Sequence, residues 1–283
     1  MQNQHILFKI HFLGVRGSTP CCNQNVVQYG GHTSCVFFEF DQKIFIIDAG
    51  SGIISANAKF NPEIHKTTHL FLSHVHLDHV MGLPFYFPFW NKEHKINIYS
   101  GTTKEYNGIQ NTLEHLFSPP VFPIPMKAFP AKKTYIDFDA KEQFQFASLT
   151  VKTINLNHPN GAIGYRFESD NHSFCYISDH EHDDSYDIDS LIEFIKDTDL
   201  LIYDSTYDDL TLHKYKGWGH STWQEAVRLG EKAKVKHIGI FHHDPSNTDI
   251  QLDKLQESVL QEHSNVTFLK QDSCFCIIDQ EFK

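Results

Sequence analysis

The stretch His74-Val75-His76-Leu77-Asp78-His79 directly follows a short apolar segment, residues 68–73, that is typical of a buried strand. Three imidazoles and a carboxylate thus lie within six residues at a strand end. Neutral imidazole with carboxylate is a ligand set that suits Zn, Fe, Mn or Ni. Burying these groups without a metal would be costly. The pattern therefore predicts a metal site.

Length and composition indicate a soluble enzyme. The chain has 283 residues, 40% hydrophobic and 13% aromatic, which is enough for a sizeable core. No repeat or linker divides it, so we expect one domain over residues 1–283. Because no apolar run reaches the ~18 residues of a membrane span and no signal sequence stands at the N-terminus, we expect a cytoplasmic protein without a membrane partner. None of the six cysteines forms a CxxC pair, so no zinc knuckle or redox motif is indicated.

The charge balance bears on the substrate. The net charge is −11, with 20 histidines counted as neutral. Lysine and arginine supply most of the non-specific affinity for polynucleotides, so an acidic chain disfavours a long nucleic acid as partner. A small phosphorylated substrate is compatible with this charge.

The order of apolar segments and turn residues predicts strands in both halves of the chain with helices between them. Such an order favours two sheets packed face to face and covered outside by helices. The expected strands are residues 6–14, 35–40, 43–48, 68–73, 95–100, 200–204 and 237–241, with a strand-rich region over 134–179. The expected helices are residues 105–117, 221–233 and a segment after Thr248, with a further helical stretch near 81–90 and an extended proline-rich connection over 118–125.

Three more strand ends carry a residue that can bind a metal. His158 follows the strand pattern of residues 151–157, and Asp179 follows that of residues 174–178. His242 follows residues 238–241, with His243 beside it as the competing candidate. Each of these alone could equally be a turn or capping residue. Together with the first cluster they predict a site at the mouth of the two sheets.

The order of these motifs resembles the metallo-β-lactamase superfamily over nearly the whole chain. Phe12-Leu13-Gly14 and residues 164–168 and 219–222 are similar to the branch that contains ribonuclease Z and small cyclic-nucleotide phosphodiesterases. Residues 14–18, 29–34 and 242–245 resemble a bacterial subgroup of uncertain substrate. The resemblance implies an α/β fold, the four-layer αβ/βα sandwich of two mixed β-sheets flanked by helices. It also implies a binuclear metal centre between the sheets.

The resemblance assigns the ligands of two divalent ions, with Zn the first choice and Mn or Fe the alternatives. One ion would be held by His74, His76 and His158, the other by Asp78, His79 and His242, with Asp179 bridging. Asp78 matters for catalysis because relatives with a single metal often vary there. A hydroxide shared by two ions about 3.5–4 Å apart would be the nucleophile of a phosphoryl displacement. We prefer His242 to His243 because the family's ligand directly follows the apolar strand.

Three further residues are candidates for supporting roles. Asp48 closes an apolar segment; in the family an Asp at this position lies behind the metal histidines, where it would orient an imidazole, but it could equally be a turn residue. His220 suits proton delivery to a leaving alkoxide. We also expect it near the start of a helix, with Ser221 or His220 itself as the N-cap. This position would bring the N–H groups of the helix close to a phosphate. Asp204 would orient His220. The alternatives are a plain helix cap for His220 and a turn cap for Asp204.

An aromatic run covers residues 83–90. It could form a pocket wall or a lid that stacks a flat group. Such runs are more often core or a dimer contact, and we favour either of these over a pocket wall or lid. A homodimer is therefore one possible assembly.

Three functions agree with these residues. The first is a metal-dependent phosphodiesterase for a small substrate, with a cyclic nucleotide the preferred choice. The second is a ribonuclease Z-like endonuclease that processes tRNA 3′ ends; the acidic charge and the lack of a long Gly/Pro-rich arm count against it. The third is a lactone or thioester hydrolase on the same binuclear centre.

Overall fold

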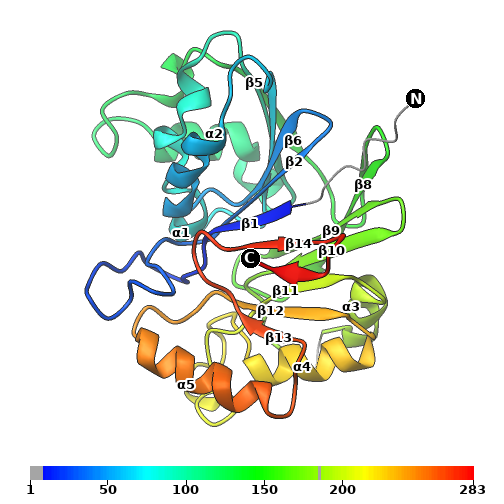
Figure 1. The fold of residues 1–283 in the computed structure, drawn as a ribbon. Helices are drawn as coiled ribbons and strands as arrows, with labels where there is room; N and C mark the ends of the chain where they lie inside the picture. The colour runs from blue at the N-terminus through cyan, green and yellow to red at the C-terminus, as the bar shows by residue number, and fades with distance from the viewer. Residues whose placement is uncertain (1–8, 184–185) are drawn as a thin grey trace.

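Two β-sheets packed face to face form the centre of the molecule (Figure 1). The computed structural model describes residues 9–183 and 186–283. One sheet has eight strands in the order β15-β14-β1-β2-β3-β4-β5-β6, and the other has seven in the order β13-β12-β11-β10-β9-β8-β7. Both sheets mix parallel and antiparallel pairs.

The strands of the first sheet are β1 Lys9–Gly14, β2 Cys35–Phe40, β3 Lys43–Ile47, β4 Thr67–Leu72, β5 Lys95–Ser100, β6 Lys132–Asp137, β14 Cys274–Cys276 and β15 Glu281–Phe282. Those of the second are β7 Gln143–Phe146, β8 Leu149–Leu156, β9 Ala162–Ser169, β10 His172–Ile177, β11 Leu200–Asp204, β12 His237–Phe241 and β13 Val266–Phe268. The α-helices are α1 Leu77–Val80, α2 Gly108–Leu116, α3 Ile188–Ile195, α4 Trp223–Lys232 and α5 Asp249–Leu260.

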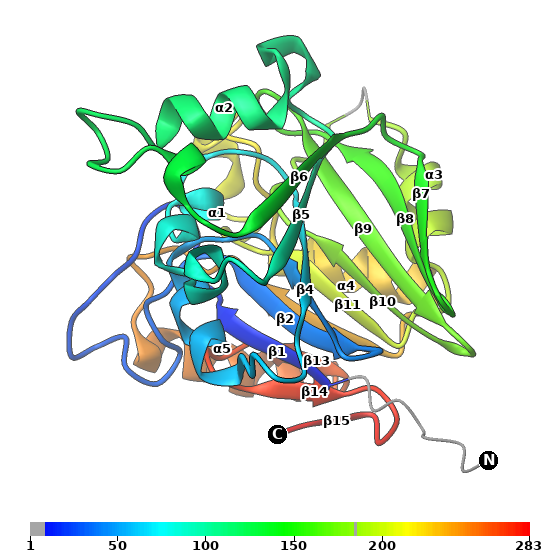
Figure 2. The same cartoon turned by 90° about the horizontal axis from the view of Figure 1, so that it is seen from above.

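Three apolar clusters hold the layers together. The first lies between the sheets and is rich in aromatic rings, with Phe71 of β4 stacked on Tyr99 of β5 and edge-on to Tyr165 of β9. The second joins the outer face of the first sheet to α2, and the third joins the outer face of the second sheet to α3, α4 and α5. Figure 1 shows α2 at the top and α4 and α5 at the bottom of the molecule, and Figure 2 shows β8, β9 and β10 side by side. The predicted four-layer αβ/βα sandwich is confirmed.

The directions of the strands bring the candidate site residues to one edge. The pairs β3·β4 and β4·β5 are parallel in the first sheet, as are β10·β11 and β11·β12 in the second. Strand β8 runs antiparallel to β9, which runs antiparallel to β10, so β8 and β10 share a direction. Carboxyl ends of strands with the same direction meet at the same edge, where open sheets bind their ligands. The segments that follow β3, β4, β8, β10, β11 and β12 therefore lie at that edge.

Some predicted boundaries differ from the structure. The expected strand over residues 6–14 begins outside the described residues, and its described part is β1. Residues 81–90 form two short 3₁₀ turns, Leu83–Phe85 and Phe87–Trp90, rather than a helix. Each turn has a proline in its first positions, and proline supplies no backbone N–H donor to continue a helix. Helix α3 was not predicted.

Helix α4 begins two residues later than expected. Its N-cap is Thr222, whose side chain accepts a hydrogen bond from the backbone N–H of Glu225 at 3.1 Å. The prediction of Ser221 or His220 as the cap was wrong. His220 instead stands in the loop that enters the helix, so its side chain is free of a capping role.

The aromatic run 83–90 divides between core and surface. Leu83, Tyr86 and Phe89 are buried in the second cluster, while Phe85 and Phe87 are exposed. Five of the eight residues are thus core, as preferred from sequence, and a dimer contact through the three exposed ones stays a prediction. No helix among the described residues is long and apolar enough to cross a membrane.

Phe71→Ala is expected to lower the free energy of unfolding by about 3–5 kcal/mol, because it leaves a large cavity between the sheets. Urea denaturation followed by tryptophan fluorescence measures this loss. Val121→Ala, at a side chain that is 76% exposed, serves as the control and should stay within about 0.5 kcal/mol of the parent. A similar small change for both variants would contradict the central position of Phe71.

Candidate metal centre

Three residues of the site turn sharply at the strand ends that carry them. Asp48 after β3, Asp179 after β10 and His242 after β12 have φ values of 60°, 60° and 61°. This left-handed conformation is uncommon outside glycine, although Asp, Asn and His adopt it more readily than most. Such strain costs about 1–3 kcal/mol per residue and persists where the surrounding structure enforces it, most often at functional sites.

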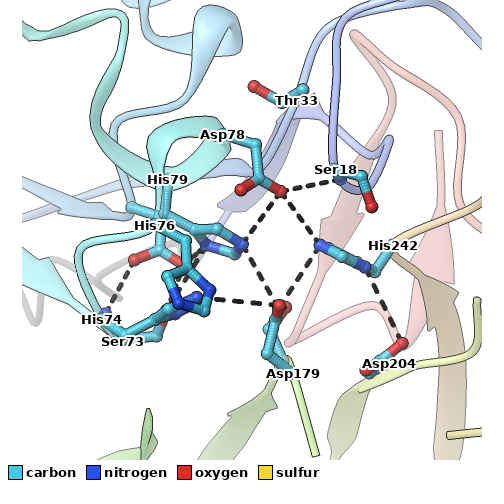
Figure 3. A network of polar contacts seen from close by, with 12 residues as sticks. Ser18, Thr33, Ser73, His74, His76, Asp78, His79, Asp179, Asp204 and His242 are labelled. Carbon is cyan, nitrogen blue, oxygen red and sulfur yellow. Dashed lines mark hydrogen bonds and ion pairs between the residues drawn. The ribbon is translucent and has the colours of Figure 1, made fainter. Parts of the chain in front are cut away.

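Asp78, His79, Asp179 and His242 form a closed ring of contacts (Figure 3). The His79 Nε2 atom lies 3.3 Å from one carboxylate oxygen of Asp78 and 3.3 Å from Oδ1 of Asp179. The His242 Nε2 atom lies 3.4 Å from the same two oxygens. In a tetrahedral zinc site with ligands at about 2.05 Å, neighbouring ligand atoms are about 3.3 Å apart. The spacing of these four atoms matches that of a zinc ligand set.

A second group meets the other oxygen of Asp179. Asp179 Oδ2 lies 3.8 Å from Nε2 of His74 and 3.7 Å from Nε2 of His158. His76 joins them through its Nδ1 atom, 3.0 Å from His158 Nε2. Ligand atoms of His74, His76 and His158 all lie within 4.8 Å of one another. Asp179 thus presents one oxygen to each group.

Hydrogen bonds on the far side of the rings set the tautomers. The Nδ1 atoms of His74, His79, His158 and His242 lie within 3.0 Å of Ser73 Oγ, Asp48 Oδ2, the Gly219 carbonyl and Thr206 Oγ1, respectively. When Nδ1–H donates to such a partner, the Nε2 lone pair is left free for a metal. These four imidazoles therefore present their Nε2 lone pairs to the cluster.

Three of these nitrogens are buried polar atoms without a hydrogen-bond partner among the described residues. They are Nε2 of His74, His79 and His242. A buried polar atom without a partner costs free energy, and all three lie beside Asp179. A divalent ion in each group would satisfy them. The residues present thus fit the two ions that the fold family implies.

Asp48 lies behind His79. Its carboxylate accepts hydrogen bonds from the backbone N–H and the hydroxyl of Ser73, from His79 Nδ1–H and from the Tyr176 hydroxyl, at 2.7 to 2.8 Å. Tyr176 comes from the opposite sheet, so Asp48 also joins the two sheets at the site. Of its two predicted roles, the structure places it where it orients an imidazole.

Charges in the cluster are concentrated and buried. Burial acts to raise the pKa of Asp179, but His242, His79 and His74 lower it well below its ordinary value. Burial lowers the pKa of His74 well below its ordinary value, with His79 adding to this, so that imidazole is neutral. Burial acts to lower the pKa of His79 too, but Asp179, Asp78 and Asp48 raise it well above its ordinary value. Imidazoles bind metals in the neutral form, so metal binding at His79 would release a proton.

His243 lies away from the cluster. Its Nε2–H donates to the carbonyl of Leu269 at 2.9 Å, and its ring stacks on Phe268 and meets Tyr29 edge-on. The neighbouring His242 faces the two carboxylates instead. The geometry agrees with the preference for His242 as the last ligand.

His220 and Asp204 form a pair beside the cluster. His220 Nδ1 lies 2.9 Å from Asp204 Oδ2, and its ring stacks on His242 with centroids 4.9 Å apart. Burial acts to lower the pKa of His220, but Asp204 and then Asp179 raise it to about 9. Asp204 therefore favours the protonated form of His220 and holds its ring in one orientation. Asp204, His220, Asp179 and His242 also have ligand-type atoms within 4.8 Å of one another. Because Asp204 and His220 are already bonded to each other, this set is a poorer metal site than the two above.

Glycines and small polar residues that the sequence analysis left without a role complete the site. The backbone N–H of Ser18 donates to Asp78 Oδ2 at 2.7 Å, and a Cβ at Gly17 would lie 2.4 Å from the His242 ring. In sequence, residues 14–18 resemble a bacterial subgroup, a likeness that assigns them no role. Only the folded chain places Gly17 against His242. Thr206 Oγ1 links Asp204 to His242.

Glu181 fixes the loop that leads to His220. Its carboxylate accepts from the backbone N–H groups of Gly217 and Gly219 at 2.7 and 2.8 Å. Gly219 in turn supplies the carbonyl bonded to His158, and a Cβ at Gly219 would lie 2.1 Å from His158 Nδ1. Glu181 follows Asp179 by two residues, but no motif or spacing in the sequence marks it as part of the site.

Comparison with known proteins identifies the family. A model described as a beta-lactamase superfamily domain matches residues 43–243, well over half of the chain. The chain belongs to the metallo-β-lactamase superfamily of hydrolases.

Individual relatives are more distant. Ribonuclease Z from Picrophilus torridus is 24% identical over 284 residues, covering 87% of this chain and 88% of the relative. The metallo-beta-lactamase fold protein YhfI from Bacillus subtilis has a TM-score of 0.72 at 19% identity, covering 95% of this chain and 98% of its own. The short form of human tRNase Z has a TM-score of 0.64 at 20% identity, covering 95% and 99%. At these identities the structures support the fold alone.

Asp48→Asn should weaken zinc binding by about 10- to 100-fold, because the outer partner of a metal-binding imidazole loses its charge. Asn also tolerates the left-handed conformation at this position, which limits any folding defect. Competition with a chromophoric chelator measures the zinc dissociation constant. Asp41→Asn is the matched control, since Asp41 has a φ of 50° and an exposed carboxylate. Equal zinc affinity in both variants would rule out the orienting role of Asp48.

Proposed function

We propose that this protein is a binuclear metal-dependent phosphodiesterase. The observation that carries the proposal is Asp179, whose two oxygens face two separate groups of ligands. Two divalent ions held there, zinc first by the choice of ligands, would supply Lewis-acid stabilisation of a phosphate and an activated water. Residues 74, 76 and 158 would hold one ion, residues 78, 79 and 242 the other, and residue 179 both.

His220 would serve as the general acid. Asp204 holds its Nδ1, which leaves the other side of the ring to face a substrate. Cleavage of a phosphodiester leaves an alkoxide that needs a proton, and a positioned imidazolium delivers one. Asp204 stabilises the charge on the ring before the transfer. Its role is to position His220 rather than to touch the substrate.

The substrate we propose is a small phosphodiester, with a cyclic nucleotide as the preferred choice. The net charge of −11 supports a small substrate over a long polyanion. The relatives named ribonuclease Z support a second candidate, endonucleolytic processing of tRNA precursors. Hydrolysis of a lactone or thioester at the same centre is a third candidate; the proton-donating pair of His220 and Asp204 counts against the thioester, whose thiolate leaves without a proton.

Removal of metal should abolish phosphodiesterase activity, and added Zn or Mn should restore it, because the imidazoles and carboxylates alone cannot activate water. The measurement is hydrolysis of bis(p-nitrophenyl) phosphate by the purified protein before and after dialysis against a chelator, with bound metal counted by mass spectrometry. Full activity in protein free of metal would end the proposal.

The same preparation separates the candidate substrates. Cyclic mononucleotides and dinucleotides, a tRNA precursor and a lactone are offered side by side. We expect turnover of a cyclic nucleotide. Cleavage of the tRNA precursor alone would establish the second candidate, and cleavage of the lactone alone the third.

His220→Ala should lower kcat on alkyl phosphodiesters by about 10²- to 10⁴-fold, since the leaving alkoxide loses its proton donor. The loss on bis(p-nitrophenyl) phosphate should be smaller, because p-nitrophenolate leaves without protonation. His213→Ala, which alters an exposed histidine on the same loop, is the control. Equal losses on the two substrates would argue against a general-acid role.

A further inference from the structure

A pocket of about 590 Å³ opens beside the candidate metal centre. His74 and His76 form its inner end, and the exposed side of α2 with the loop before it forms its outer wall. The opposite side of α2 buries Ile109 and Leu113 against the first sheet, which fixes the wall in place. Ligand pockets for small molecules typically measure 300–1,000 Å³, so this one is large enough for a nucleotide-sized group.

The lining of this pocket carries several amide side chains but almost no charge. Three asparagines line it, Asn107, Asn111 and Asn160, together with Thr102 and Tyr106. Among the described residues no Lys or Arg lines it, and Glu105 is the one acidic group. A nucleic-acid backbone is held chiefly by Lys and Arg, so the lining does not suit a run of phosphates.

One amide of the lining reaches the metal centre. The side-chain amide of Asn160 lies 3.4 Å from His76 Nε2, at the boundary between pocket and metal centre. Asn160 is exposed, so its amide is accessible to a ligand in the pocket. A ligand with its phosphate at the metals would therefore lie beside this amide.

We propose that this pocket binds the nucleoside part of a small phosphodiester whose phosphate lies at the metal centre. The inference rests on the phosphodiesterase function proposed above. Side-chain amides match the hydrogen-bonding edges of bases, and an aromatic ring offers a stacking surface. A lining with no Lys or Arg and a single acidic group, Glu105, suits one uncharged group beside one phosphate, which is the chemistry of a mononucleotide ester.

Kinetics on two chromogenic esters test the pocket. The p-nitrophenyl ester of thymidine 5′-monophosphate carries a nucleoside, and bis(p-nitrophenyl) phosphate does not. Asn111→Leu should raise the ratio of the KM for the thymidine ester to that for bis(p-nitrophenyl) phosphate by about tenfold, the effect of a lost hydrogen bond. Gln110→Leu is the matched control: it makes the same kind of change at the preceding residue of α2, which does not line the pocket, and should leave both KM values unchanged.

Thermal stability gives a second readout. Asn111 is on the exposed side of α2, so Asn111→Leu should keep the melting temperature of Gln110→Leu while it raises the KM ratio. A lower melting temperature with an unchanged ratio would assign Asn111 a merely structural role and overturn its part in binding.

The outcomes separate this inference from the proposed function. If bis(p-nitrophenyl) phosphate is hydrolysed in a metal-dependent way but Asn111→Leu does not change the ratio, the pocket assignment is overturned and the phosphodiesterase function stands. If the protein with its metals restored hydrolyses neither ester, the function itself fails and the pocket assignment with it.

Discussion

The carboxylate of Asp179 is the interaction on which the arrangement of the site depends. It lies after β10 of the second sheet, while the six imidazole and carboxylate groups around it come from the loop after β4 and the ends of β8 and β12. With Oδ1 toward His79 and His242 and Oδ2 toward His74 and His158, it makes one cluster out of residues from both sheets. The Tyr176–Asp48 hydrogen bond joins the sheets at the same place.

This arrangement costs stability, and the rest of the fold must offset that cost. Three strand-end residues adopt the left-handed conformation, and several nitrogens are buried without partners. The aromatic core between the sheets and the helices on their outer faces supply the compensating burial. Close packing also leaves room for glycine alone at positions 17 and 219, where a Cβ would collide with His242 and His158. Metal affinity and folding stability are therefore linked through the same groups.

Charge is distributed in a way that accords with a small substrate. The carboxylates at residues 48, 78, 179 and 204 are buried among imidazoles at the metal centre, whereas the adjoining pocket carries amides, one acidic group and no Lys or Arg. The short form of human tRNase Z shares the fold, so the fold alone does not decide the substrate. The proposal of a small substrate rests instead on the groups that line the approach to the centre.

Local sequence determined the elements and the kinds of ligand. The alternation and length of apolar segments predicted nearly all long strands, and the HxHxDH run with three later strand-end residues named the seven side chains that meet in the cluster. The start of α4 and the 3₁₀ turns at 83–90 were missed because capping by Thr222 and the prolines at 84 and 88 outweigh apolar periodicity. Only the tertiary structure decided that His242 rather than His243 faces the carboxylates, that Ser18 and Glu181 support the site, and that α2 walls a pocket beside it. These facts depend on contacts between residues far apart in the sequence, such as Ser18 and Asp78, which are 60 positions apart. No local sequence pattern predicts such contacts.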